Sequence, residues 1–278
     1  MSINKIYLTT KDYLVTKEKF SLVHDTSLDM LITTPQPKNL SIYYEDTTYI
    51  SHQDKPKNLL EVIYQTVKKY TLNKKIKFIN KFKNDSNSLL DIGAGTGEFI
   101  LHAKNAKWKT IGVEPGNQAR EKANKKGLTI VKNIDEIGNQ KFDVITLWHV
   151  LEHLPDLDEQ LNKIEKLLKI GGTLIVAVPN FKSYDAKHYK EFWAAYDTPR
   201  HLWHFSQKSI SALFNTKGLE IIKTTPMYFD SYYVSLLSEK YKKGNSKYLK
   251  AVYHGWLSNY KARATGEYSS LIYTLQRM

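Results

Sequence analysis

A glycine-rich turn between two short apolar segments constrains the fold of this chain more than any other feature. Residues 89–92 read Leu-Leu-Asp-Ile, three glycines follow within five positions, and the next segment has apolar residues at helical spacing. Residues 110–113 form a second apolar run, which ends at Glu114. A strand, a glycine turn, a helix and a second strand are the parts of a βαβ unit. The sequence therefore predicts a parallel sheet that is built outward from residues 88–114.

The spacing of the glycines favours a nucleoside ligand that has no pyrophosphate. A turn at the carboxyl end of a strand needs positive φ or close backbone approach, and glycine supplies both. A dinucleotide fingerprint requires G-x-G-x-x-G or Ala, but Glu98 stands at the last position, and no G-K-[ST] follows. Glu114 lies 23 positions after Asp91 (114 − 91), where its carboxylate can accept hydrogen bonds from two ribose hydroxyls.

The string D-x-G-x-G-x-G, followed by Glu114, resembles motif I of the class I S-adenosylmethionine (SAM) dependent methyltransferases. The resemblance covers about residues 86–278 in outline. It implies an α/β fold with a doubly wound, mostly parallel, seven-stranded sheet, which is a Rossmann-like methyltransferase fold. It also implies SAM as the cofactor, bound by Asp91, Gly93, Ala94, Gly95, Gly97, Glu114, Pro115, Asn133, Ile134, Trp148 and His149.

Composition limits the class of protein. The chain has 278 residues, 41% of them hydrophobic and 25% charged, which suits one large domain with an accessory segment. No apolar run approaches the roughly 20 residues of a membrane span, and the N-terminus has no signal-peptide core. Because the chain has no cysteine, it has no disulfide and no thiolate metal site. We expect a cytoplasmic protein, and the sequence does not indicate its oligomeric state.

The net charge of +13 raises the question of a nucleic-acid partner. Only four of the 41 basic residues are arginine, the side chain favoured for bidentate phosphate and base contacts. The densest lysine run, within residues 68–83, lies on a predicted helix and is interpreted as a solvated face. Nucleic acid is therefore not the expected partner.

Residues 1–57 are interpreted as an N-terminal accessory and lid segment that precedes a methyltransferase domain at 58–278. Strand-like pieces are expected at 13–15, 20–23 and 30–33. In similar proteins of the subgroup named below, a segment of this layout carries a cysteine-ligated zinc ribbon; without cysteine, no metal is expected here. The aromatic cluster at 43–52 is either a packed anchor or a lid, with Tyr49 and His52 pointing inward. Residues 58–82 predict two helices with a break at Asn73.

A second group of polar residues follows the predicted strand 142–147. The string Trp148-His-Val-Leu-Glu-His153 resembles the V-L-E-H signature of methyltransferases related to ubiquinone-biosynthesis O-methyltransferases. Some of those use Glu-x-x-Glu-His for a divalent cation, but His149 replaces the first acid here, and hard cations prefer oxygen ligands. Glu152 and His153 are therefore interpreted as a network at a helix start.

Two insertions are expected to cap the sheet, an aromatic one at 180–206 and a helical one at 230–266. The segment 197–206 resembles a string of the same subgroup. Three large aromatic side chains (Trp193, Trp203 and Phe205) are expected in the core, and three nearby histidines (His188, His201 and His204) lack a fixed zinc-ligand spacing. The acceptor substrate is expected to contact Tyr49, His52, Tyr184, Tyr189, Arg200 and His201. Further strands are expected at 128–131, 173–178, 219–225 and 269–275, the last one antiparallel.

Together these features predict methyl transfer from SAM to a small-molecule acceptor by in-line displacement. Because histidine titrates near neutral pH, His149 is the first candidate for the general base, and His201 or His204 the second. Three alternatives stay open: an RNA methyltransferase, a non-catalytic SAM-binding or scaffolding protein, and an NAD-dependent oxidoreductase, which Glu98 disfavours.

Overall fold

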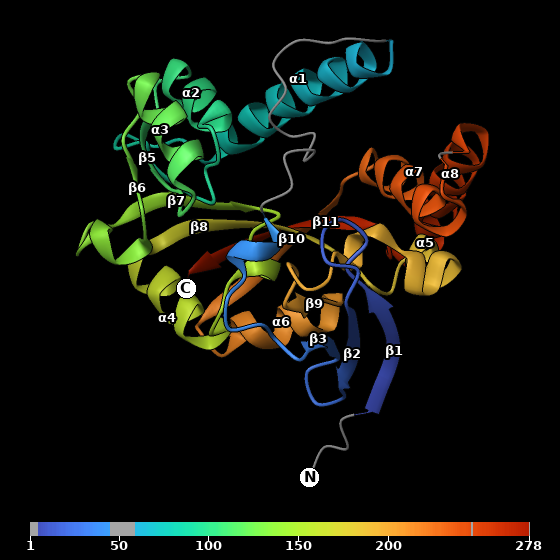
Figure 1. The fold of residues 1–278 in the computed structure, drawn as a ribbon. Helices are drawn as coiled ribbons and strands as arrows, with labels where there is room; N and C mark the ends of the chain where they lie inside the picture. Colours follow the sequence, from blue (N-terminus) through green and yellow to red (C-terminus); the bar gives the residue numbers. More distant parts are fainter. Residues whose placement is uncertain (1–4, 45–58, 246, 278) are drawn as a thin grey trace.

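The computed structural model describes residues 5–44, 59–245 and 247–277, and this part of the chain contains two β-sheets (Figure 1). The larger sheet has seven strands in the order β10-β11-β8-β7-β4-β5-β6. These are β4 (Ser88–Ile92), β5 (Lys109–Val113), β6 (Ile130–Val131), β7 (Phe142–Trp148), β8 (Leu168–Pro179), β10 (Leu219–Pro226) and β11 (Ser270–Arg277).

The directions of the strands follow the predicted fold. β4 pairs in parallel with β5 and with β7, and β7 pairs in parallel with β8. Only β11 runs against its two neighbours in this sheet, β8 and β10. The order reverses at β4, so ligands are expected where the carboxyl ends of β4 and its neighbours meet. The prediction of a doubly wound, mostly parallel, seven-stranded sheet is confirmed.

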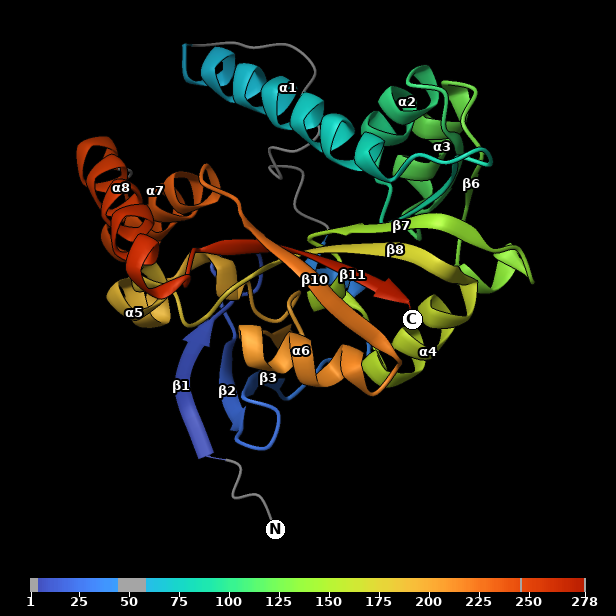
Figure 2. The same cartoon turned by 180° about the vertical axis from the view of Figure 1, so that it is seen from behind.

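Helices cover both faces of this sheet (Figures 1 and 2). Leu89 and Leu90 are both fully buried, but they belong to different apolar clusters because consecutive strand residues point to opposite faces. The Leu89 side packs on α1 (Leu59–Ile79) and α2 (Glu98–Asn105). The Leu90 side packs on α4 (Leu157–Leu167) and α6 (Gln207–Asn215). α3 (Asn117–Lys125) contacts β6.

The second sheet joins the N-terminal segment to the first insertion. It is antiparallel, with the order β1 (Lys5–Lys11), β2 (Lys19–Asp25), β3 (Met30–Thr34) and β9 (Trp203–His204). Leu31 pairs with His204, and Ile32 pairs with Trp203. The N-terminal strands β1, β2 and β3 therefore share a sheet with β9, which belongs to the 180–206 insertion.

The second insertion is helical, as expected. α7 (Asp230–Lys243) and α8 (Tyr248–Thr265) pack against each other, and α5 (Tyr184–Tyr189) from the first insertion packs against both (Figure 2). No helix in the described ranges is both long and apolar enough to cross a membrane.

Two local predictions are wrong. α1 is continuous through Asn73, because an exposed asparagine costs only a few tenths of a kcal/mol in a helix and the apolar contacts continue on both sides of it. Residues 13–15 form a turn, since the Asp12 carboxylate accepts hydrogen bonds from the backbone N–H groups of residues 14, 15 and 16. Gly171 and Gly172 lie inside β8, at an irregularity of its pairing with β7.

Candidate functional site

The glycine turn after β4 is shaped by close packing. Gly93 and Gly97 have φ of +75° and +79°, a region in which other residues are strained. A Cβ at Gly93 would lie 2.3 Å from Val150 Cγ2, and one at Gly97 would lie 2.5 Å from Leu128 Cδ1. A Cβ at Gly95, with φ +54°, would meet nothing within 4 Å. Gly93 and Gly97 therefore allow the turn to pack closely on Val150 and Leu128. The space beside Gly95, where a Cβ would lie, is open.

Glu114 joins this turn to the carboxyl end of β5. Its Oε2 accepts a hydrogen bond from the Gly95 backbone N–H at 2.8 Å, and its Oε1 accepts one from the Gly116 backbone N–H at 2.8 Å. A carboxylate offers about four lone-pair positions, so two remain available. The half-buried Glu114 side chain is thus fixed in place and can still accept hydrogen bonds from a diol.

Asp91 lies beneath the turn and is almost completely buried. Thr146 Oγ1 of β7 donates a hydrogen bond of 2.6 Å to its carboxylate. Burial raises the pKa of Asp91 to about 7, although the hydroxyl of Thr146 and the ammonium of Lys75 act in the opposite direction. Burial likewise lowers the pKa of Lys75 to about 8, against the attraction of Asp91 and Asp230. A carboxyl and an amine that both titrate near neutral pH mark this edge as a functional-site candidate.

Lys75 corrects the interpretation of the basic helix as an entirely solvated face. The described lysines at 69, 74, 77, 81 and 83 are exposed, but Lys75 is half-buried with its Nζ 4.3 Å from the centroid of the Trp148 ring. Trp148 ends β7 and also packs edge-on against Phe99. Its indole Nε1 is buried without a hydrogen-bond partner.

His149 is held between two carboxylates. Its φ of +57° lies in the left-handed region, and its Nε2 is 3.1 Å from Asp230 Oδ2 at the start of α7. Its Nδ1 is 3.5 Å from Glu152 Oε1. Burial lowers the pKa of His149, but the two carboxylates outweigh burial and raise it to about 9. The imidazole is therefore protonated at neutral pH in this arrangement.

Glu152 connects His149 to two further histidines. Its side chain is fully buried, and neither carboxylate oxygen has a hydrogen-bond partner. One ligand atom from each of Glu152, His153 and His201 lies within 4.8 Å of the others, so the three side chains could share a cation. Burial and the neighbouring His201 lower the pKa of His153 to about 4. Both Glu152 and His153 belong to the short helix Leu151–His153, whose N-cap makes no side-chain hydrogen bond, so their interpretation as a network at a helix start stays a prediction.

The other two histidine candidates lie deeper in the molecule. His201 is 8% exposed, and its Nδ1 is 2.9 Å from the backbone oxygen of Ala195. His204, in β9, is 4% exposed and hydrogen-bonds Thr33 Oγ1 through Nε2 at 3.0 Å. Burial lowers the pKa of His204 well below its usual value. His149, with a side chain 33% exposed, is the most accessible of the three.

Arg200 joins the insertion to the N-terminal segment. It is 1% exposed, and its guanidinium donates to the carboxylates of Asp12 and Asp197 and to the backbone oxygen of Tyr43. The Tyr43 hydroxyl in turn donates to Glu18 at 2.6 Å. In this position Arg200 acts as a buried link between two segments, which differs from the substrate contact expected of it.

The remaining predicted substrate residues lie elsewhere. Tyr184 stacks on His188 with Lys261 Nζ 4.1 Å above its ring, and Tyr189 is 1% exposed against His254. Both therefore pack with α8. Tyr49 and His52 are outside the described residues.

The cofactor residues predicted after β5 and β6 have varied surroundings. Pro115 and Asn133 are exposed at the same edge of the sheet as Glu114. Asn133 Oδ1 accepts a hydrogen bond from the Glu136 backbone N–H, and Ile134 is 8% exposed in the core. Ala94 is also buried, and its backbone N–H donates to the Val113 carbonyl.

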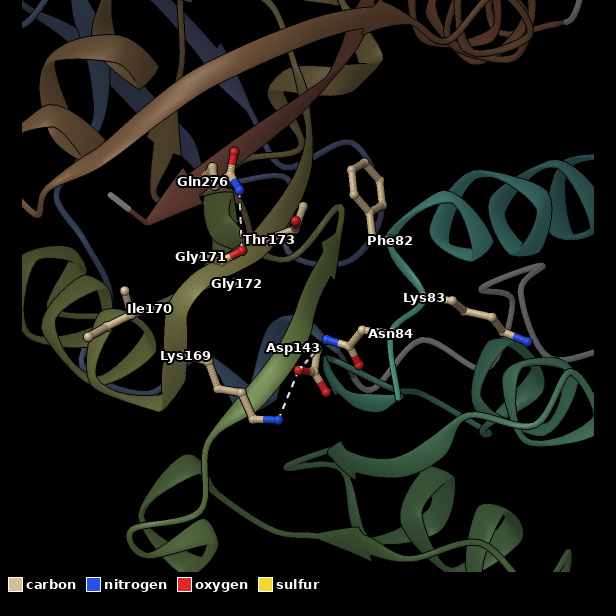
Figure 3. A pocket seen from close by; sticks show the side chains of 10 residues that line it. All are labelled: Phe82, Lys83, Asn84, Asp143, Lys169, Ile170, Gly171, Gly172, Thr173 and Gln276. Atoms are coloured by element: carbon tan, nitrogen blue, oxygen red, sulfur yellow. Dashed lines mark hydrogen bonds and ion pairs between the residues drawn. The ribbon is translucent and has the colours of Figure 1, made fainter. Parts of the chain in front are cut away.

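A separate pocket of about 210 Å³ lies at the opposite edge, near the amino ends of β4 and β7 (Figure 3). Asp143 lies in it and accepts hydrogen bonds from Lys169, Ser88 and Asn84. These contacts hold the pKa of Asp143 well below its usual range, although burial opposes them. The Asp143 carboxylate is therefore satisfied by groups of the protein at this junction between strands.

Sequence reasoning missed several residues at the carboxyl edge. Lys75 and Asp230 belong to helices far from the glycine turn in sequence, so no local spacing could reveal them. Thr146 lies within the predicted strand 142–147 and Val150 follows it, and their apposition to Asp91 and Gly93 follows from the parallel pairing of β4 with β7.

Comparisons with known proteins agree with this geometry. A family model described as "Methyltransferase domain" matches residues 63–224. A ubiquinone biosynthesis O-methyltransferase of Actinobacillus pleuropneumoniae is 33% identical over 106 residues, covering 33% of this chain and 45% of that protein. An uncharacterized protein of Methanocaldococcus jannaschii is 33% identical over 110 residues, covering 39% and 43%. The chain thus spans less than half the length of these two relatives.

Solved structures show the same fold at low identity. Magnesium protoporphyrin IX methyltransferase from Synechocystis PCC 6803 with bound SAH is 15% identical, with a TM-score of 0.55, covering 81% of this chain and 90% of that one. A possible histamine N-methyltransferase from Thermotoga maritima is 18% identical, with a TM-score of 0.51, covering 78% and 97%. The family model covers 162 of the 278 residues (224 − 63 + 1) and includes β4, β5 and β7 with the glycine turn. The chain belongs to the methyltransferase-domain family and has the Rossmann-like fold of class I SAM-dependent methyltransferases.

Proposed function

We propose that this chain binds SAM at the carboxyl edge of the seven-stranded sheet and catalyses transfer of its methyl group to a small-molecule acceptor. The hydrogen bond from the Gly95 N–H to Glu114 carries the proposal, because it fixes a diol-accepting carboxylate beside an open glycine turn. SAM supplies a methyl group on a sulfonium, which is a good leaving group. The protein has to orient the reactants and exclude water.

The residues present fit such a cofactor. The open face of Gly95 leaves room for close approach to the backbone, and Glu114 has unused lone pairs for the ribose hydroxyls. Trp148 offers an unpaired indole N–H beside the turn. Asp91 holds the turn from below through Thr146 of the neighbouring strand.

On the acceptor side, His149 lies between carboxylates from two separate elements. Glu152 comes from the helix after β7, and Asp230 comes from α7. Lys75 of α1 interacts with Asp230 and lies over the Trp148 ring. A site bordered by these three elements suits a compact acceptor better than a polymer. As general base His149 removes a proton from an acceptor hydroxyl or amine, and it does so only in its neutral form. Catalysis through His149 therefore increases as the pH approaches about 9.

Two measurements test the proposal in sequence. Calorimetric titration with SAM, S-adenosylhomocysteine and NAD should show binding of the first two ligands and not of NAD. Binding of NAD alone would favour an oxidoreductase. The protein is then incubated with methyl-labelled SAM and either a small-metabolite extract or total RNA. Label in the metabolite fraction supports the proposal, whereas label in RNA would replace it with RNA methylation. SAM binding without label in either fraction would favour a scaffolding role.

A further inference from the structure

A second cluster of metal-ligand side chains lies apart from the sheet edge, within the helical cap. His188 of α5, Glu239 of α7 and His254 of α8 each place one ligand atom within 4.8 Å of the other two. The three residues come from three helices and from both insertions. Their separations in sequence, 51 and 15 positions (239 − 188 and 254 − 239), match no local ligand motif.

The environment of these groups is unusual for residues that serve packing alone. Glu239 is 4% exposed, and a buried carboxylate needs compensation by hydrogen bonds, an opposite charge or a cation. The Tyr189 hydroxyl lies beside it. The nearby ammonium groups of Lys242 and Lys250 are on exposed residues, where solvent screens them.

The two histidines lie close together, and one of them has an unpaired ring nitrogen. The His254 Nδ1 is buried without a hydrogen-bond partner, and its ring lies 3.9 Å from that of His188 with a 24° tilt. A histidine ring nitrogen is a common metal ligand in proteins.

We propose that His188, Glu239 and His254 form a zinc site that ties α5, α7 and α8 together. Two imidazoles and one carboxylate are a usual zinc donor set, with bonds of about 2.0–2.2 Å. Such bonds place tetrahedral ligand atoms about 3.3 Å apart. Coordination of one ion by both histidines would require their rings to rotate out of the observed stack. Magnesium and calcium are disfavoured because they prefer oxygen ligands.

The consequence is structural and independent of methyl transfer. One ion would cross-link the 180–206 insertion to both helices of the 230–266 insertion. α7 carries Asp230, the partner of His149, at its first residue. A bound zinc ion would therefore also fix the end of the cap that contacts the proposed active centre.

The test uses the full chain, stripped with a chelator and titrated with Zn²⁺ alone in a calorimeter. The Glu239→Gln and His254→Gln variants are compared with a His102→Gln control, since His102 lies on α2 with its Nδ1 facing the Glu98 backbone oxygen. Glu152→Gln is included because the other three-residue cluster could bind the ion instead. We expect saturable binding of wild-type protein that weakens by about tenfold or more in the two ligand variants. We expect it to persist in the His102 and Glu152 variants.

Spectra and folding controls keep the result interpretable. Titration of wild-type protein with Co²⁺ should produce visible d–d absorption bands that the Glu239→Gln variant lacks, which reports the ligands directly. Circular dichroism of each metal-free variant shows whether it is folded. The proposal is overturned if wild-type protein binds no Zn²⁺ at 100 times its own concentration. Unchanged binding in folded Glu239→Gln and His254→Gln, or loss of binding only in Glu152→Gln, would also overturn it.

Discussion

The Gly95 backbone N–H donates a 2.8 Å hydrogen bond to Glu114 Oε2, so the glycine turn and the acid after the next strand are coupled without a ligand. The parallel pairing of β4 with β5 brings the ends of these strands together. The backbone of the glycine turn therefore orients the Glu114 carboxylate and also leaves room for the cofactor.

Replacing Glu114 with alanine should weaken SAM binding by about 10- to 100-fold, because hydrogen bonds to a charged group contribute about 1.5–3 kcal/mol each. Calorimetry measures the change. Glu121→Ala, on the exposed face of α3, is the matched control and should bind SAM as wild type does. Equal affinities in the two variants would remove Glu114 from the cofactor site.

Gly93→Ala should mainly lower the stability of the fold, whereas Gly95→Ala should mainly weaken SAM binding. Both place a side chain at positive φ, but only the Gly93 variant adds a Cβ that meets Val150 at 2.3 Å. Urea unfolding should show that Gly93→Ala loses more stability, and that adding Val150→Ala restores part of the loss. Gly95→Ala should keep more of its stability and lose SAM affinity. A Gly95 variant that binds SAM normally would argue against cofactor approach at that face.

The pKa of His149 should be about 9, and it should decrease in Asp230→Asn. A histidine with a raised pKa stabilises the fold fully below its unfolded pKa of about 6.5, and this contribution disappears as pH rises through about 9. NMR titration of carbon-labelled histidine gives the value without any acceptor. Once an acceptor is known, kcat/KM should increase about tenfold per pH unit below pH 9. In Asp230→Asn the rising part of this pH profile should move to lower pH. A normal histidine pKa in wild-type protein would contradict the arrangement.

Arg200→Ala should destabilise the fold by about 3–5 kcal/mol, because it leaves the buried Asp12 carboxylate without its cationic partner. Urea unfolding measures this loss, with the exposed Arg263→Ala as the control. SAM affinity of the folded variant should be unchanged. A stable Arg200 variant that fails only in acceptor binding would restore the substrate role expected from the sequence.

The sequence predicts the parts of this molecule that depend on local chemistry. The glycine turn and the buried strand at 142–147 follow from composition and spacing, and the structure confirms them. Lys75 could not be distinguished from the exposed lysines around it, since its burial depends on Trp148 from another element. Arg200 was expected to contact the substrate for a related reason. Its partner Asp12 lies 188 positions away, so the sequence does not reveal that the two side chains pair. Polar residues that are paired across long separations look functional in sequence until their partners are located.

The pairing of β3 with β9 has a consequence for biosynthesis. β3 ends at Thr34 and pairs with Trp203 and His204, so a ribosome adds 170 residues (204 − 34) between them. At about 5–20 residues per second, the β3 edge waits roughly 10–30 seconds for its partner. During that interval the nascent chain presents an unpaired strand edge, the kind of surface that chaperones shield and that aggregates recruit. A chain that stops before residue 203 therefore lacks β9, and its four-stranded sheet stays incomplete.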